Sequence, residues 1–255
     1  MKKPLIFNHQ IALKKPENIR NKEAYCPFCD VAHLKQIFRQ EGQKIWLMNK
    51  YRTFEDAYQT IIIESSEHWK DISSYNQSEN RSIFRFTFDC WLEMLHDDRF
   101  HKVLFFKNHG PLSGGSIRHP HFQIVGLQNK ENEDEVTIEN LKGIEVVSKG
   151  SVSVNISTAP IVGASEFNVF IGNLEDLDIF ADAVQGIVRY VLKHTFSANS
   201  DSYNLFFYAM AGGYYCKVMP RFITSPYFIG FKMSQVLRLE ELVKIAEKIK
   251  PVLPL

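Results

Sequence analysis

The same order of elements occurs in both halves of the chain, and this repetition is the feature that most constrains the fold. In the first half, a helical pattern over residues 80–98 precedes LFFKNHGPLSGGSIRHPHFQI; in the second, a helical pattern over residues 176–194 precedes LFFYAMAGGYYCKVMPRFI. Each segment has the pattern of an apolar strand, a loop with a glycine pair and a second short strand. The matched order predicts a degenerate internal duplication.

Strand-like runs alternate with helical ones along the rest of the chain. Strands are expected at residues 44–48, 59–64 and 167–171, and helices at residues 31–41 and 236–250. Runs of strands between helices with short connections predict an α+β fold with mainly antiparallel sheets. We expect a first half at residues 1–145 and a degenerate second half at residues 146–255. The charged segment NKENEDE, residues 129–135, is expected to be an exposed turn shortly before the boundary.

Composition excludes several classes of partner. The chain of 255 residues has 30 Lys and Arg against 29 Asp and Glu, so its net charge of +1 does not indicate nucleic acid or an anionic membrane as a partner. No stretch approaches the ~18 apolar residues of a spanning helix, and MKKPLIFNHQ lacks the apolar run of a secretory signal. Four cysteines are too few for a disulfide scaffold, which favours a reducing compartment and a cytoplasmic location.

The segment His119-Pro-His-Phe-Gln123 is the most informative for chemistry. On a strand, His119, His121 and Gln123 share one face, because successive side chains alternate. Three polar groups on one face of an apolar strand are either solvated or part of a site. The preceding loop, NHGPLSGGS at residues 108–116, offers backbone amides at its glycines and hydroxyls at its serines. Such a loop beside imidazoles suits a phosphoryl group; a tight hairpin turn with surface histidines is the alternative.

The Cys26-Pro-Phe-Cys29 spacing is that of half a zinc site or of a redox pair, and it also arises by chance. A redox pair of the thioredoxin type lies between a strand and a helix, whereas this pair follows a polar lead-in, which favours a metal. Structural zinc needs four ligands, and no second CxxC exists, so histidines must complete the set. Nine histidines are available. His68, after the Ile-rich strand, and His119 are candidates that spacing alone does not select.

These motifs together resemble the galactose-1-phosphate uridylyltransferase branch of the histidine-triad superfamily, which includes ADP-sugar phosphorylases and dinucleoside polyphosphate phosphorylases. The resemblance covers about residues 20–126. It rests on Cys26-Pro-Phe-Cys29, Asn49-Lys50-Tyr51, Glu64-Ser-Ser-Glu-His68, Asn108-X-Gly110, Gly114-X-Ser116 and His119-Pro-His121-X-Gln123. In the second half it is limited to Asn204, Pro220-Arg221 and an expected strand at residues 227–231. It implies a fold of tandem histidine-triad-like repeats.

The resemblance also implies roles for particular residues. The ligands of a structural zinc would be Cys26, Cys29, His68 and His119. His121 would be the nucleophile that attacks the α-phosphorus of a nucleoside diphosphate compound. The phosphoryl oxygens of that compound would be held by Gln123, Asn108, Ser116 and the loop glycines Gly114 and Gly115. Asn49 would contact the nucleoside. Members of this branch often form homodimers, so a dimer is expected.

The residue types agree with this chemistry. A neutral histidine is a competent nucleophile near neutral pH. Gln123 stands where the hydrolases of the superfamily place a third histidine, and a glutamine cannot act as a general acid. The leaving group must therefore depart as an anion, as a sugar phosphate with a second pKa of ~6 does. The predicted reaction is nucleotidyl transfer or phosphorolysis on a nucleotide sugar or dinucleotide.

Two alternatives stay open at this point. Water could be the acceptor, which would make the protein a nucleotide hydrolase using the same His121 intermediate. The second half has no histidine in Gly213–Arg221, so it predicts no second metal site, and this degradation would also suit a nucleotide-binding protein that has lost turnover. The base, the sugar and the acceptor are not predicted.

Overall fold

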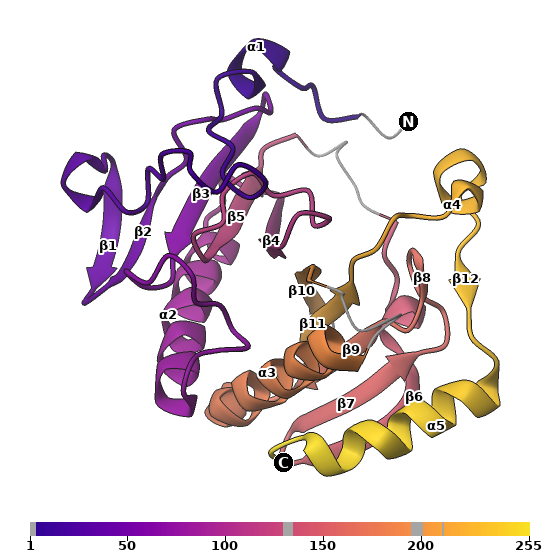
Figure 1. The fold of residues 1–255 in the computed structure, drawn as a ribbon. Helices are drawn as coiled ribbons and strands as arrows, with labels where there is room; N and C mark the ends of the chain where they lie inside the picture. Colours follow the sequence, from indigo (N-terminus) through magenta and orange to yellow (C-terminus); the bar gives the residue numbers. More distant parts are fainter. Residues whose placement is uncertain (1–3, 130–134, 195–200, 211) are drawn as a thin grey trace. The chain divides into compact units, whose positions relative to one another are not determined.

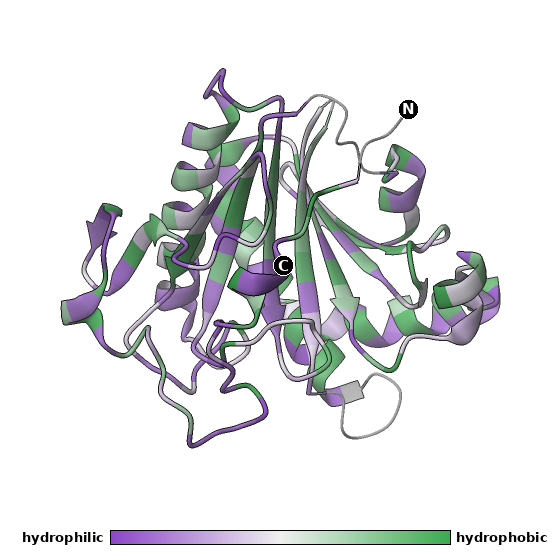
Figure 2. Ribbon diagram, turned by 90° about the horizontal axis from the view of Figure 1, so that it is seen from above, coloured by the Kyte–Doolittle hydropathy of each residue, from purple (hydrophilic) through white to green (hydrophobic). Residues whose placement is uncertain are grey.

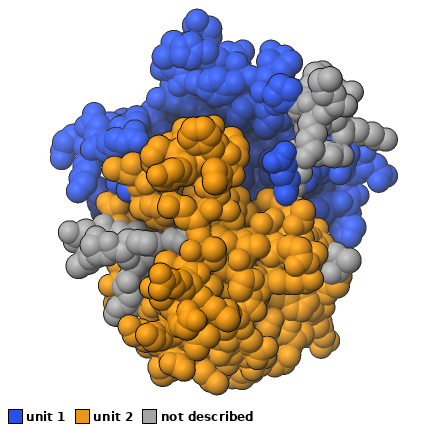
Figure 3. All heavy atoms as spheres, turned by 90° about the vertical axis from the view of Figure 1, so that its right-hand side faces the viewer, with its two compact units in different colours: residues 1–71, 85–135 blue, residues 72–84, 136–255 orange. Residues whose placement is uncertain are grey.

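The computed structural model describes residues 4–129, 135–194, 201–210 and 212–255 (Figure 1). The chain divides into two compact units, residues 1–71 with 85–135 and residues 72–84 with 136–255 (Figure 3). Residues 130–134 of the expected exposed turn lie outside the described residues. The sequence puts the boundary between halves after residue 145, and the structural division falls ten residues earlier, between Glu135 and Val136. The assignment of catalysis to the first half stays a prediction.

Unit 1 contains five consecutively paired antiparallel strands. In spatial order they are β1 (Ile37–Glu41), β2 (Lys44–Met48), β3 (Ala57–Ile63), β5 (His121–Leu127) and β4 (Lys102–His109). Helix α2 (Gln77–Leu95) connects β3 to β4 along the chain. A short helix, α1 (His9–Ala12), precedes all of these strands.

Unit 2 contains its own antiparallel strands. In spatial order they are β6 (Gly143–Lys149), β7 (Val152–Ser157), β9 (Phe167–Ile171), β11 (Gly213–Pro220) and β10 (Tyr203–Met210). The short strands β8 (Gly163–Ala164) and β12 (Gln235–Val236) pair in parallel beside them. The helices of this part are α3 (Leu177–His194), α4 (Pro226–Phe231) and α5 (Leu239–Ile249).

The strand orders confirm the tandem α+β fold. Each unit has three strands, then a helix, then a hairpin whose second strand pairs with the third strand. The two LFF triplets do not match residue for residue, however. Phe105, the middle residue of the first triplet, packs against Phe88 of α2, whereas Phe207, the last residue of the second, packs against Phe84. The duplication is therefore preserved in element order and shifted by one residue in this strand.

Aromatic packing explains why α2 lies on one face of the unit 1 strands. Trp91 and Phe88 contact Phe105, whose ring lies 5.4 Å from that of Phe122. All four side chains are almost fully buried. Figure 2 shows hydrophobic and hydrophilic residues alternating along the strands, as expected when the two faces differ. Within the described residues, no helix has the length and apolar content to cross a bilayer.

Two elements differ from the sequence expectation. The helix expected over residues 31–41 is wrong: a 3-10 turn ends at His33, and β1 then forms a hairpin with β2 through Gly42, whose φ of 59° suits glycine. The strand expected at residues 227–231 is helix α4. Ser225 caps it by accepting the Tyr227 N–H at 3.3 Å, and Lys232 ends it with a φ of 57°.

A buried cluster fills the face of the unit 2 strands that carries Lys217. The Lys217 ammonium lies 3.0 Å from a Glu166 carboxylate oxygen and 3.0 Å from Asn168 Oδ1, and it donates to the Asn140 carbonyl at 2.6 Å. Burial lowers the pKa of Lys217, and Glu166 opposes that shift. The cavity beside Glu166 has a volume of only about 10 Å³, room for a single water molecule.

We expect Gly143→Ala to destabilise unit 2. A Cβ at Gly143 would lie 1.8 Å from the Ile156 carbonyl oxygen, so the backbones of β6 and β7 would have to separate. Overpacking of this kind lowers the free energy of unfolding by about 1–3 kcal/mol. Thermal unfolding of Gly143→Ala and of the control Gly230→Ala, where no atom lies within 4 Å, measures it. Equal melting temperatures for the two variants would contradict the expected clash.

Candidate active site

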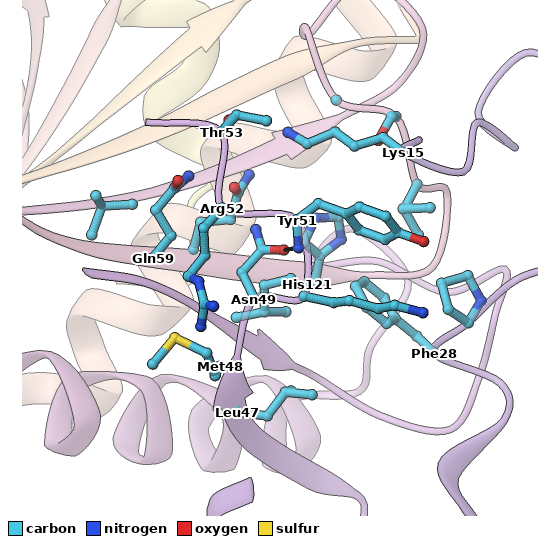
Figure 4. A pocket seen from close by; sticks show the side chains of 18 of the residues that line it. Lys15, Phe28, Leu47, Met48, Asn49, Tyr51, Arg52, Thr53, Gln59 and His121 are labelled. Atoms are coloured by element: carbon cyan, nitrogen blue, oxygen red, sulfur yellow. Dashed lines mark hydrogen bonds between the residues drawn. The ribbon is translucent and has the colours of Figure 1, made fainter. Parts of the chain in front are cut away.

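Unit 1 contains a cavity of about 740 Å³ on the sheet face away from α2 (Figure 4). Its floor consists of alternate residues of three strands. These are Gln59 and Ile61 of β3, Leu104, Phe106 and Asn108 of β4, and His121, Gln123 and Val125 of β5. Leu47 and Met48 of β2 also line the cavity, and the remaining walls come from the N-terminal segment, the residues around Cys26, residues 33–36, the loop after β2 and the glycine loop. The cavity is large enough for a nucleotide-sized ligand.

The cavity lining carries positive charge. Its cationic lining residues are Lys15, Lys35, Lys50 and Arg52, and no aspartate or glutamate lines it among the described residues. The chain as a whole is nearly neutral, with a net charge of +1. The carboxylate of Asp30 lies behind this lining, bonded to Tyr25 and His33, so an anionic ligand would meet mainly attraction here.

His121 is held in the tautomer that a nucleophile requires. Its Nδ1 lies 2.8 Å from the His119 carbonyl oxygen, which can only accept, so Nδ1 carries the proton and donates it. Nε2 is therefore unprotonated, and its lone pair is available for attack. Burial lowers the pKa of His121 to about 4; the hydrogen bond to the His119 carbonyl opposes this shift, and the charges of Lys107 and His119 add to it. The ring is therefore neutral at physiological pH.

A buried ion pair lies behind His121, on the α2 side of the strands. Lys107 of β4 pairs with Glu64, which directly follows β3, and both side chains are at most 1% exposed. The Lys107 ammonium also lies 5.1 Å from the centre of the Phe122 ring. The pair is sequestered from the cavity, so Lys107 acts on His121 only through its electric field.

The glycine loop has a conformation that its glycines explain. Gly110 and Gly114 have φ angles of 83° and 82°, a region that other residues rarely adopt. The Ser113 hydroxyl donates to the Gly110 carbonyl at 2.7 Å and closes the turn. A Cβ at Gly115 would lie 3.1 Å from the Cβ of Asn108, so glycine allows the loop to pass close to β4.

Two polar side chains of the cavity are placed for ligand contact. The carboxamide of Gln123 makes no hydrogen bond to another described residue, and it shares the β5 face with His121. Asn49 is buried after β2, and its Oδ1 accepts the Tyr51 N–H at 2.8 Å (Figure 4). That bond fixes the Asn49 amide and folds the loop so that Tyr51 also lines the cavity.

The CxxC motif and two histidines form a cluster next to the cavity. The ligand atoms of Cys26, Cys29, His68 and His119 all lie within 4.8 Å of one another. Cys29 Sγ is 3.3 Å from His68 Nδ1 and 3.4 Å from His119 Nδ1. This donor set of two thiols and two imidazoles could hold a metal ion of tetrahedral preference.

Hydrogen bonding and burial prepare this cluster for a metal. His119 Nε2 donates to the Ser65 carbonyl at 2.8 Å, so Nδ1 directs its lone pair at the cluster. Burial is the main cause that lowers the pKa of both histidines, and the charge of Arg118 adds to it in each case, which favours their neutral forms. Burial and Cys26 raise the pKa of the Cys29 thiol to about 11. Two thiolates this close together need a cation to balance their charge.

The structure brings the residues singled out from the sequence into two adjacent groups. His121, Gln123, Asn49, Asn108, Gly114, Gly115 and Ser116 line the cavity, and Cys26, Cys29, His68 and His119 form the cluster. His119 lies just outside the strand, because β5 begins at His121. His109, which directly follows Asn108, does not line the cavity, and its Nδ1 lies 3.6 Å from a carboxylate oxygen of Asp71.

Phe28 is a site residue that the sequence did not reveal. It lies between the two cysteines, and its ring centre is 5.2 Å from that of His121 and 6.0 Å from that of His119, edge-on to both. Phe28 also belongs to a buried cluster with Leu47 and Ile61. Its only sequence signal was an apolar residue inside CxxC, which also fits a purely structural role.

Paired repeats with this strand order, a His-X-Gln strand and an adjoining Cys₂His₂ cluster agree with the tandem histidine-triad-like fold expected from the motifs. The chain belongs to the DUF4931 family. Models of the N-terminal and C-terminal DUF4931 domains, both domains of unknown function, match residues 7–130 and 133–251. A crystal structure of a DUF4931 family protein from Bacillus cereus ATCC 10987 is 36% identical, with a TM-score of 0.76, over 86% of this chain and 100% of that one.

Two more distant solved structures share the fold. An ADP-glucose phosphorylase from Arabidopsis thaliana with bound ADP-glucose is 12% identical, with a TM-score of 0.69, over 92% of this chain and 90% of that one. A uridylyltransferase is 14% identical, with a TM-score of 0.68, over 91% and 92% of the two chains. No curated protein matches the sequence. The resemblance inferred from the motifs is thereby confirmed for the fold.

Proposed function

We propose that this protein transfers a nucleoside monophosphate group through a covalent bond to His121. The observation that carries the proposal is His121 itself, buried and neutral with Nδ1 bonded to its own backbone, in a cavity of cationic lining. The donor is a nucleotide sugar or a dinucleotide, in keeping with the ADP-glucose bound to the related phosphorylase. The acceptor is phosphate or a sugar phosphate.

The proposed transfer has two displacements. His121 Nε2 attacks the α-phosphorus, a P–N bond forms, the P–O bond to the leaving phosphate breaks, and the bond's electron pair goes to that oxygen. The acceptor oxygen then attacks the same phosphorus and releases His121. Gln123 donates N–H hydrogen bonds to the phosphoryl oxygens and supplies no proton, so the leaving group departs as an anion.

The other residues around His121 position the nucleotide. The Gly114 amide, the Ser116 hydroxyl and the Asn108 amide hold the phosphoryl group in line for attack, which is the main requirement for phosphoryl transfer. The Gly115 N–H joins them by exchanging its 3.3 Å bond to the Ser113 hydroxyl for one to the phosphoryl group. Asn49, fixed by its bond from Tyr51, contacts the nucleoside.

The metal in this proposal is a structural zinc ion held by Cys26, Cys29, His68 and His119. Thiolate and imidazole donors favour zinc over magnesium or calcium. Such an ion ties together the segments that carry its ligands, and the one ending in His119 continues directly into His121. Homodimer formation and a cytoplasmic location stay predictions.

Intact-mass spectrometry after incubation with UDP-sugars, ADP-sugars and dinucleoside polyphosphates tests the proposal. One donor is expected to add the mass of a nucleoside monophosphate, mapped by peptide analysis to His121. The adduct should disappear when phosphate or a sugar phosphate is added and should persist in buffer. Loss of the adduct in buffer alone would indicate a hydrolase, and binding without any adduct would indicate a nucleotide-binding protein.

A further inference from the structure

The N-terminal segment at residues 7–19, here called the strap, is attached to unit 1 at both ends. At one end Phe7 bridges to Phe54, and the Asn8 N–H donates to the Thr53 carbonyl at 2.7 Å. At the other end the Asn18 N–H donates to the Ser116 carbonyl at 2.9 Å. The Asn18 side chain also accepts the Arg118 N–H at 2.6 Å. The strap therefore joins the loop before β3 to the glycine loop before β5.

Lys15 is the strap residue whose charge faces the cavity. It lines the cavity together with Pro16, and Figure 4 shows its side chain extending into it. Among the described residues, its ammonium has no hydrogen-bond or ion-pair partner. Burial lowers the pKa of Lys15, a cost that no carboxylate offsets. Its neighbour Lys14 is exposed and does not line the cavity.

The direction of in-line displacement gives Lys15 a role. The nucleophile His121 belongs to the sheet floor, so the leaving group must depart on the opposite side of the α-phosphorus, away from the sheet. The strap is not part of the sheet, yet its Lys15 lines the same cavity. In the proposed function, the glycine loop and Gln123 bind the α-phosphoryl group. The strap is then the element that can bind the next phosphate of the donor.

Building on the proposed function, we propose that Lys15 binds the phosphate of the leaving group and stabilises the negative charge it gains as the P–O bond breaks. The role requires a donor whose leaving group carries its own phosphate next to the α-phosphorus, as the donors of the proposed function do. Gln123 cannot protonate the leaving group as a general acid would. The Lys15 ammonium instead stabilises the leaving group as an anion. No proton moves in the step, because the leaving phosphate departs as the anion that Lys15 neutralises.

The other cationic lining residues suit this role less well. Lys50 is exposed, and its ammonium lies 5.6 Å from the centre of the Tyr51 ring. Lys35 and Arg52 are also exposed. An exposed cation shares its charge with water and salt, whereas a half-buried one without a partner acts mainly on the ligand.

Calorimetric titration with ADP and AMP, and with UDP and UMP, tests the role of Lys15. In Lys15→Met, the dissociation constant of the diphosphate is expected to rise about 10- to 100-fold, the usual effect of removing a hydrogen bond to a charged group. The dissociation constant of the monophosphate should rise less than about threefold. Lys15→Arg should restore most of the diphosphate affinity, and the matched control Lys14→Met should change neither constant more than about twofold.

The outcomes separate this inference from the proposed function. Equal weakening of diphosphate and monophosphate by Lys15→Met, or no weakening at all, overturns the role of Lys15 even if the His121 adduct forms. Selective weakening in a protein that forms no adduct supports Lys15 and refutes the transfer reaction. Failure of the unsubstituted protein to bind either diphosphate overturns both. Unchanged thermal unfolding of Lys15→Met establishes that the variant is folded.

Discussion

Replacing His121 by alanine is expected to abolish the nucleotidyl adduct and to reduce turnover at least about 10³-fold, the scale seen when a covalent nucleophile is removed. His33 also lines the cavity, but it is exposed, does not belong to the sheet floor and has its Nδ1 2.7 Å from an Asp30 carboxylate oxygen, so we do not expect it to take over the attack. Binding of the nucleotide should change far less, because its other contacts come from the loop and from Gln123. The rate of adduct formation and the dissociation constant of the nucleoside monophosphate, measured on the same variant, separate the two effects.

His96→Ala is the matched control for this experiment. His96 is exposed at the end of α2 and does not line the cavity, so the variant should keep full activity. Persistence of the adduct in His121→Ala, or its mapping to another residue, would contradict the assignment of the nucleophile. A large loss in both variants would point to a general effect of losing a histidine.

Removing the metal is expected to lower the free energy of unfolding by at least about 4 kcal/mol, the stabilisation from a ligand present at 1,000 times its dissociation constant. The reason is that the four ligand residues come from three separate segments, which a bound ion would tie together. Cys26→Ser should lose a metal that the unsubstituted protein carries at one ion per chain. Elemental analysis and thermal unfolding with and without chelator measure both quantities.

Cys90→Ala is the control, because Cys90 is fully buried in α2 and is not part of the cluster. It should keep its metal. Trp69 adds a direct signal: its ring lies 4.5 Å from that of His68, whereas Trp46 and Trp91 are buried elsewhere. Its fluorescence should change on metal loading. A Cys26→Ser protein with full metal content and unchanged stability would refute a structural metal at this cluster.

Local patterns account for the parts of the fold that the sequence predicts. Alternation along β5 puts His121 and Gln123 on one face, and the structure has both in one cavity. The glycine loop is predictable because its backbone angles at Gly110 and Gly114 require glycine. The duplication is visible as well, because the helix and hairpin recur in the same order.

Non-local contacts account for what the sequence does not predict. Spacing could not choose His68 and His119 among nine histidines, because their approach to Cys26 depends on the whole sheet. Helix α4 was expected as a strand, because its apolar run is equally compatible with a helix and with a strand. The Ser225 cap is the feature that favours the helix. Lys15 carries no local signal at all. It acquires its position from the two attachments of the strap.

The cationic lining of the cavity affects the rate at which an anionic substrate associates with the protein. Lys107 and Lys217 are neutralised internally by Glu64 and Glu166, so they contribute little to the field outside the molecule. Lys15, Lys35, Lys50 and Arg52 have no such compensation in the cavity wall. A small anion is therefore guided to the opening before it makes any contact, and added salt slows that encounter. A long polyanion gains little, because the chain apart from these four cavity cations has a net charge of −3.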